Sequence, residues 1–186
     1  MTEFELIVID KMISYLLIVT IIAAPFLVIN FYRYEKDYSD RKQSGEYVSY
    51  VSWFTGLPYK SILAFIVPII VTFILSSLMI STVRSNILDF LLSATPATTI
   101  IVEDNVVSNT SIVLSELQKI ETHVERHSHP EKDIHITIKN KGNTLELRLG
   151  RDSGRPSKYW VFYPHYKHTS MNAIGKITTS LFDSYK

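Results

Sequence analysis

The sequence contains no cysteine and only six glycines among its 186 residues. The absence of cysteine excludes disulfide bridges, thiolate catalysis and cysteine-based zinc sites. The glycines form neither a phosphate-binding loop nor a dinucleotide-binding fingerprint, and Ser153 lacks the flanking glycines of a nucleophile elbow. We therefore expect no enzymatic activity, no catalytic residue and no cofactor.

Charged side chains are absent from two long stretches, Met12–Tyr32 and Ser61–Val83, although the whole chain has a balanced charge of +1. A helix rises ~1.5 Å per residue, so each stretch can cross a hydrocarbon core that is ~30 Å thick. Two very apolar core helices in a soluble protein are the alternative, but both stretches are long for that role. The N-terminal flank, residues 1–11, lacks the net positive charge of a cleaved signal peptide. The sequence predicts two uncleaved transmembrane helices, at residues 12–32 and 61–83.

Each predicted span contains a proline, which kinks a membrane helix, and the second span also contains hydroxyl residues. Small hydroxyl residues let helices pack closely and self-associate in the bilayer, and they also line pores in oligomers. Neither span contains an ionisable residue, which argues against a proton relay or an ion-coupled transporter. The candidate packing or pore residues are Pro25, Pro68, Thr72, Ser76, Ser77 and Ser81.

The loop between the spans, residues 33–60, is highly charged at first and then aromatic over Tyr47–Phe54. The aromatic part is typical of an element that lies in the lipid headgroup layer. Basic residues near the membrane are more numerous in this loop than beside the two outer ends, where Lys11 and Arg84 lie. The positive-inside rule therefore places the loop in the cytoplasm and the C-terminal domain outside.

We interpret residues 84–97 as a stalk and residues 98–186 as a small, water-soluble α+β domain. β-branched residues predict a strand at 98–103. Alternating apolar residues around the turn Lys141-Gly142-Asn143 predict a hairpin, and a further strand is expected at 158–163.

Apolar spacing predicts two helices in the same domain. One follows Asn109, with Val113, Leu117, Ile120 and Val124 on its apolar face; the other starts near Ser170, with Ile174, Ile177 and Leu181 on one face. The resulting order, β-α-β-β-β-α, predicts an antiparallel sheet with two helices on one side.

Three histidines, His123, His127 and His129, are the candidate metal ligands. On a helix, His123 and His127 share a face, and two imidazoles at that spacing can bind a transition metal. The catalytic H-E-x-x-H pattern is absent, and a solvated helix end explains the same residues, because histidine favours the negative pole of a helix. We predict no metal site.

Basic residues gather on the predicted hairpin and the loop after it, close to two aromatic residues. Such a surface can bind a phosphate backbone with aromatic stacking, or an acidic protein or anionic lipid, and a solvated rim is the alternative. The candidate partner-binding or nucleic-acid-binding residues are Lys139, Lys141, Arg148, Arg151, Arg155, Lys158, Tyr159 and Trp160.

The succession of Met12–Tyr32, Ser61–Val83 and the domain Thr98–Lys186 resembles the two-transmembrane effectors of bacterial anti-phage systems, especially those of retrons. The resemblance implies an abortive-infection toxin of the cell inner membrane, held silent by a complex of reverse transcriptase and its RNA–DNA product. It implies a cytoplasmic C-terminal domain, whereas the count of basic residues favours an external one. The alternative is a non-toxic, two-pass membrane anchor or sensor whose soluble domain binds a protein or ligand.

Overall fold

The computed structural model describes residues 1–45, 58–95, 97–122 and 128–185. The predicted headgroup element at Tyr47–Phe54 lies outside these residues. The chain divides into two compact units, which we call the sheet unit and the hairpin unit. The sheet unit consists of Met1–Asp10 and Ser77–Lys186, and the hairpin unit consists of Lys11–Ser76.

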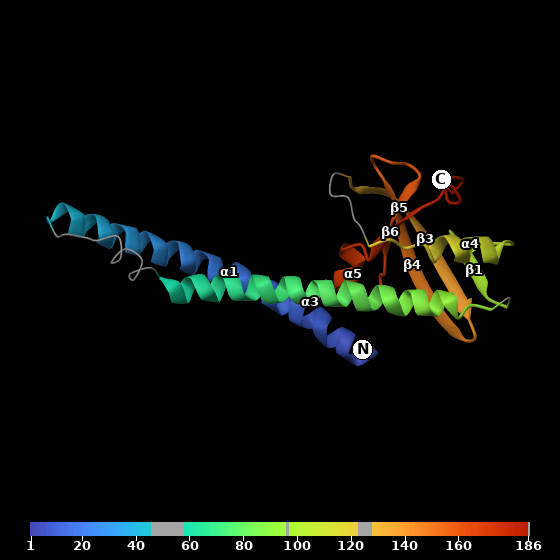
Figure 1. Cartoon of the computed structure of the whole chain (residues 1–186), viewed down its shortest axis with the longest axis horizontal. Coiled ribbons are helices and arrows are strands. Elements are labelled where there is room, and N and C mark those ends of the chain that lie inside the picture. Colours follow the sequence, from blue (N-terminus) through green and yellow to red (C-terminus); the bar gives the residue numbers. More distant parts are fainter. Residues whose placement is uncertain (46–57, 96, 123–127, 186) are drawn as a thin grey trace. The chain divides into compact units, whose positions relative to one another are not determined.

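Two long helices, α1 (Glu3–Gln43) and α3 (Tyr59–Leu92), contain the two uncharged stretches (Figure 1). At the start of α1, Thr2 and Glu5 cap each other reciprocally: the Glu5 N–H donates to the Thr2 hydroxyl, and the Thr2 N–H donates to the Glu5 carboxylate. Both helices continue through their prolines. Since α3 extends to Leu92, most of the segment predicted to be a stalk is the last part of this helix.

The sheet unit is built on six strands in the order β2-β1-β3-β4-β5-β6, and every neighbouring pair is antiparallel. The strands are β1 (Thr99–Val102), β2 (Asn105–Val106), β3 (Pro130–Asn140), β4 (Asn143–Asp152), β5 (Lys158–Phe162) and β6 (Gly175–Thr178). The prediction of an antiparallel sheet is confirmed. In the turn between β3 and β4, Lys141 and Gly142 both have positive φ angles, as a tight two-residue hairpin turn requires.

Two short helices complete the unit, α4 (Thr110–Leu117) and α5 (Lys167–Met171). The predicted C-terminal helix is wrong, because Ile177 lies in β6 and Ile174 directly precedes that strand. Lys176 is also buried, so both faces of this strand are covered and the alternation that marks a strand is hidden. Strand β2 has no counterpart among the predicted elements.

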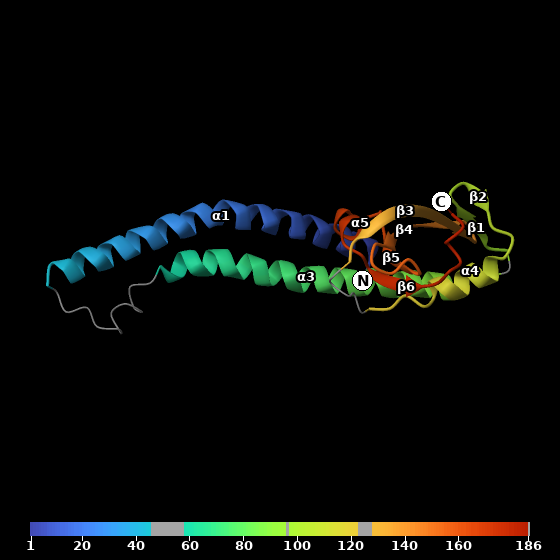
Figure 2. The same cartoon turned by 90° about the horizontal axis from the view of Figure 1, so that it is seen from above.

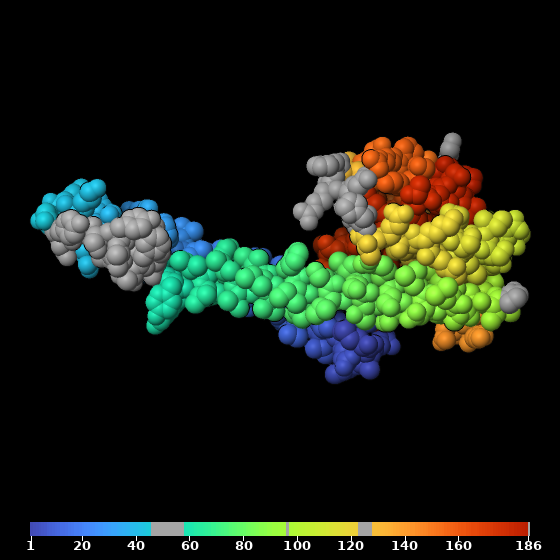
Figure 3. All heavy atoms as spheres, in the orientation of Figure 1, coloured from blue at the N-terminus to red at the C-terminus, as the bar shows by residue number. Residues whose placement is uncertain are grey.

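One face of the sheet forms the core, with Ile136, Leu147 and Val161 almost completely buried. Helix α3 contributes Met79, Val83, Ile87 and Leu91 to this core, and α4 contributes Val113 and Leu117. The end of α3 and α4 lie side by side, where the Gln118 amide donates to the Leu91 carbonyl at 3.1 Å (Figures 2 and 3). The last residues of the second uncharged stretch, from Ser77 on, therefore belong to the sheet unit.

Candidate functional site

The two helices of the hairpin unit expose apolar side chains around most of their surface. Of the most apolar 18-residue stretch in each helix, only 6% is buried in α1 and 11% in α3. A core helix of a soluble protein would be mostly buried, which these helices are not. Large exposed side chains include Ile21, Phe26 and Val28 on α1, and Ile70, Phe73 and Ile74 on α3.

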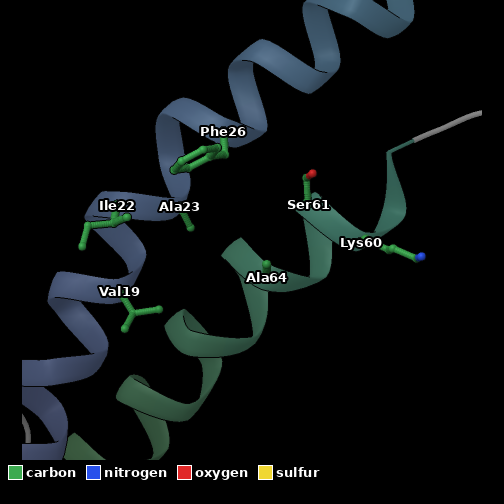
Figure 4. Close-up of a pocket in the computed structure, with 7 residues that line it drawn as sticks. All are labelled: Val19, Ile22, Ala23, Phe26, Lys60, Ser61 and Ala64. Carbon is green, nitrogen blue, oxygen red and sulfur yellow. The ribbon is translucent and has the colours of Figure 1, made fainter.

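Within the hairpin unit, a direct polar contact joins the helices: the Asn30 amide donates to the Ser61 hydroxyl at 2.7 Å. Next to this contact is an open, apolar groove of about 420 Å³. Figure 4 shows Ala23 of α1 and Ala64 of α3 on the facing sides of the groove, with the Lys60 ammonium pointing away. The groove is lined by Val19, Ile22, Ala23, Phe26, Lys60, Ser61 and Ala64.

The candidate packing or pore residues divide between the two units. Pro25, Pro68, Thr72 and Ser76 lie in the hairpin unit, whereas Ser77 and Ser81 lie in the sheet unit and are exposed. The Thr72 hydroxyl is buried and has no hydrogen-bond partner within the described part of the chain. An unpaired hydroxyl in an apolar helix costs free energy.

Asp10 of α1 binds the amino end of α5 within the sheet unit. Its carboxylate accepts the backbone N–H of His168 at 2.7 Å and that of Lys167 at 3.3 Å. The side chain of Tyr166, the N-cap residue of α5, makes no capping hydrogen bond. Asp10, from a distant part of the sequence, caps α5 instead. Burial lowers the pKa of His168, and the charge of Asp10 opposes this shift.

Arg84 of α3 binds the chain just beyond α5. Its Nε donates to the backbone carbonyl of Ile174 at 2.8 Å, and burial lowers the pKa of Arg84. The segment Lys167–Ile174 is therefore attached at one end to α1 and at the other end to α3. We call Asp10, Arg84 and the segment Lys167–Ile174 the junction.

The first turns of α1 also pack on the sheet unit through an apolar contact. Leu6 is buried beside a cavity of about 190 Å³ whose other lining residues include Val83, Ile87 and Tyr166. The pKa of Tyr166 is raised to about 12, mainly by burial and to a smaller extent by nearby phenol and carboxylate groups. His165 lies 3.3 Å from the Glu3 carboxylate, in a contact that is charged on both sides only when the imidazole is protonated.

The candidate basic residues do not form one continuous surface. Lys139 and Lys141 are exposed near the turn of the β3–β4 hairpin, and Arg155 is exposed beyond the far end of β4. The length of β4 separates these two places by about 30 Å. Lys158, at the start of β5, is half-buried.

The two remaining arginines of this set are engaged within the sheet unit. Arg148 pairs with Asp133 at 2.8 Å and lies over the Phe162 ring, 4.1 Å from its centroid. Arg151 pairs with Asp183 at 3.2 Å.

The two candidate aromatic residues are also part of the sheet unit's own packing. Tyr159 is fully buried in the core and its hydroxyl donates to the Asp183 carboxylate at 2.6 Å, so its ring does not present a stacking face. Burial, followed by the hydrogen bond to Asp183, raises the pKa of Tyr159. Trp160 is half-buried, and the Lys176 ammonium lies 3.7 Å from the centre of its ring.

Asp152 and Lys176 form a buried ion pair that the sequence patterns do not predict. Their charged atoms are 2.8 Å apart, and their side chains are 1% and 4% exposed. The Ser128 hydroxyl and the Gly154 N–H also donate to Asp152. Burial alone would raise the pKa of Asp152, but these hydrogen bonds and the ammonium outweigh it and hold the pKa well below its usual range.

Two of the three candidate metal ligands, His123 and His127, lie outside the described residues. The third, His129, contacts the Ser153 hydroxyl at 3.3 Å. Within residues 1–45, 58–95, 97–122 and 128–185, no group of three or more histidine, aspartate or glutamate side chains is placed to hold a metal ion.

The junction joins residues far apart in the sequence, and neither Asp10 nor Arg84 carries a local motif that indicates its partner. The only sequence signal is their position, just outside the two uncharged stretches. A comparison of the chain with protein-family models, curated proteins and solved structures finds no match in any of the three.

Proposed function

We propose that the chain is a two-pass membrane protein of the cell inner membrane, in which the hairpin unit crosses the bilayer and the sheet unit remains in water. The exposed apolar side chains of α1 and α3 carry this proposal. Each large apolar side chain gains ~1.5–3 kcal/mol when it leaves water, so a bilayer stabilises a surface that water would penalise. In the sheet unit, by contrast, β3 and β4 expose polar and charged side chains such as His135, Lys139 and Glu146.

The bounds of the hairpin unit fit the thickness of a bilayer. From Lys11 to Tyr32, α1 is about 33 Å long, and from Tyr59 to Ser76, α3 is about 27 Å long. The charged last turns of α1, beyond Arg33, then extend into the water on the other side. In this arrangement both ends of the chain lie on the same side of the membrane.

For the activity, we propose a membrane-disrupting effector of anti-phage defence that is controlled through its sheet unit. A partner complex, such as reverse transcriptase with its RNA–DNA product, would bind the sheet unit, and release would allow hairpins to associate and make the membrane leak. Two observations support this control. Helix α3 is continuous from the core of the sheet unit into the hairpin unit, and Asp10 attaches α1 to α5.

Thr72, whose hydroxyl has no hydrogen-bond partner among the described residues, and Ser76, one turn further along α3, are the positions that we assign to this association. Expression of the chain without a partner should depolarise cells, and Ser76→Lys should abolish depolarisation because the charge would disrupt helix packing in the bilayer. The matched control is Ser85→Lys, an exposed serine of α3 in the sheet unit, which should leave depolarisation unchanged. An intact membrane potential during expression of the unaltered chain would rule out the effector.

A non-toxic anchor or sensor is the second candidate, and the distribution of basic residues favours it. Arg33, Lys36, Arg41 and Lys42 lie in the last turns of α1, and the positive-inside rule favours a cytoplasmic position for that end and an external one for the sheet unit. A reporter fused to the C-terminus separates the two functions. A cytoplasmic reporter supports the effector, and an external one supports the sensor.

A further inference from the structure

Helix α5 exposes one basic and one large apolar residue, and its first residues bind Asp10, which directly precedes the hairpin unit in the chain. Lys167 is exposed, and Met171 is 72% exposed. A long cationic side chain beside an apolar one is the combination that lies favourably at a bilayer surface, with the ammonium near lipid phosphates and the thioether among the upper acyl carbons.

The attachment of α5 to Asp10 sets how far α5 lies from the proposed membrane segment. Asp10 is the last residue of the first part of the sheet unit, and the uncharged stretch of α1 starts two residues later, at Met12. Both N–H groups at the start of α5 bind its carboxylate, at 2.7 and 3.3 Å. The amino end of α5 is therefore within hydrogen-bond distance of the residue that precedes the proposed membrane segment.

Arg84 sets the direction in which the segment continues. It binds the Ile174 carbonyl, and along α3 it lies about 10 Å beyond Ser77, where the sheet unit resumes. The chain from Lys167 to Ile174 thus begins at Asp10 and ends at Arg84. Since the headgroup layer on each side is ~5–8 Å thick, a helix held next to Asp10 lies within it.

We propose that α5 is a lipid-contact element that rests in the headgroup layer, where Lys167 faces lipid phosphates and Met171 enters the interface. The proposal rests on the membrane insertion of the hairpin unit and adds that the sheet unit itself touches the bilayer. The contact would fix the sheet unit at the membrane surface, beside the attachments that hold α1 and α3.

The absence of cysteine allows a direct test, because an introduced cysteine is the only site for a thiol-reactive dye. Three positions have nearly the same exposure in the protein: Met171 at 72%, Phe73 at 71% and Val106 at 70%. Each is replaced by cysteine in the full-length chain, labelled with a polarity-sensitive fluorophore and reconstituted into vesicles of phosphatidylcholine and phosphatidylglycerol. Quenching is then measured with aqueous iodide, with a headgroup spin-labelled lipid and with an acyl-chain spin-labelled lipid.

The three labels should report three environments. Phe73→Cys, in the hairpin unit, should be quenched by the acyl-chain label. Val106→Cys, on the edge strand β2 of the sheet unit, should be quenched by iodide, because the body of the sheet unit is proposed to remain in water. Met171→Cys should be quenched several-fold more by the headgroup label than by either of the other two quenchers.

The outcomes separate this inference from the proposed function. Met171→Cys quenched by iodide like Val106→Cys, while Phe73→Cys responds to the acyl-chain label, overturns the lipid contact alone. Iodide quenching at Phe73→Cys overturns the membrane insertion and, with it, the lipid contact. Lys167→Glu in the Met171→Cys chain should weaken quenching by the headgroup spin-labelled lipid in vesicles that contain phosphatidylglycerol. Unchanged quenching would show that Lys167 does not take part in the lipid contact.

Discussion

The carboxylate of Asp10 accepts the backbone N–H of His168 at 2.7 Å, across 158 positions of the sequence. This bond gives a short helix in the C-terminal part of the chain a capping group from the first helix. It also makes the first turns of α1 part of the sheet unit, together with the burial of Leu6. The attachment of α1 to the sheet unit is thus a specific contact that single substitutions can remove.

Asp10→Ala should destabilise the sheet unit by about 0.5–2 kcal/mol, because α5 loses its capping carboxylate. Hydrogen exchange of the α5 amides in the detergent-solubilised chain should accelerate by a corresponding factor. The control is Asp89→Ala, which removes an exposed aspartate of α3 and should leave that exchange unchanged. Equal exchange in Asp10→Ala and the unaltered chain would show that the cap contributes nothing.

Lys176→Met should cost about 3–5 kcal/mol of unfolding free energy, because it leaves the Asp152 carboxylate buried without its cation. Adding Asp152→Leu should recover part of this loss, which a double-mutant cycle by thermal or denaturant unfolding would measure. Lys119→Met, which removes an ion pair between an exposed lysine and the half-buried Glu116, serves as the matched control and should change stability by less than about 1 kcal/mol. If Lys176→Met and Lys119→Met lowered the unfolding free energy by similar amounts, burial would not be the reason that the ion pair of Lys176 matters for stability.

The stability of the sheet unit should fall in acid because of Asp152. The pKa of this carboxyl is lower in the folded chain than its ordinary value of 3.8, so the unfolded chain takes up the proton first. Its contribution is complete above the ordinary value and is lost progressively as the pH falls below it. Asp152→Asn should flatten this part of the pH–stability curve, whereas Asp104→Asn, at an exposed turn, should leave the curve unchanged.

Gly175→Ala should destabilise the chain by about 1–3 kcal/mol through overpacking. An added Cβ would lie 2.5 Å from the Ile120 side chain and 2.6 Å from the Glu121 carbonyl oxygen, which pairs with β6. Gly154→Ala is the matched control, since its nearest neighbours would be at 3.6 Å or more. Equal melting temperatures for the two variants in detergent would contradict the close packing of Glu121 on β6.

Periodicity and turn chemistry predicted the parts of the fold that local rules govern. The β3–β4 hairpin shows both signals, with isoleucines and leucines alternating on either side of a Lys141-Gly142 turn. Strand β2 was missed because it has two residues and follows a Glu103-Asp104 turn whose positive φ angles are usually found with asparagine or glycine. The apolar spacing after Asn109 predicted α4, but the helix ends at Leu117, and Ile120 is buried beyond it.

The junction and the buried ion pair could not be predicted from the sequence, since their partners are distant in the chain. An uncharged stretch also does not distinguish a membrane span from a core helix. The stretch from Ser61 to Val83 contains both kinds of position, because Met79 and Val83 are buried in the sheet unit whereas Phe73 is exposed. The contacts of the individual residues, not their apolar character, set the boundary between the two units at Ser77.

Labelling single cysteines from one side of a sealed membrane tests the two-pass arrangement most directly. Ser44→Cys lies after the charged end of α1, and Val106→Cys lies in the sheet unit; both positions are exposed. With a membrane-impermeant maleimide, only one of the two cysteines should react in intact vesicles of uniform orientation, and both should react after detergent is added. Reaction of both cysteines in the intact vesicles, or recovery of the folded chain without detergent in the soluble fraction, would contradict the membrane hairpin.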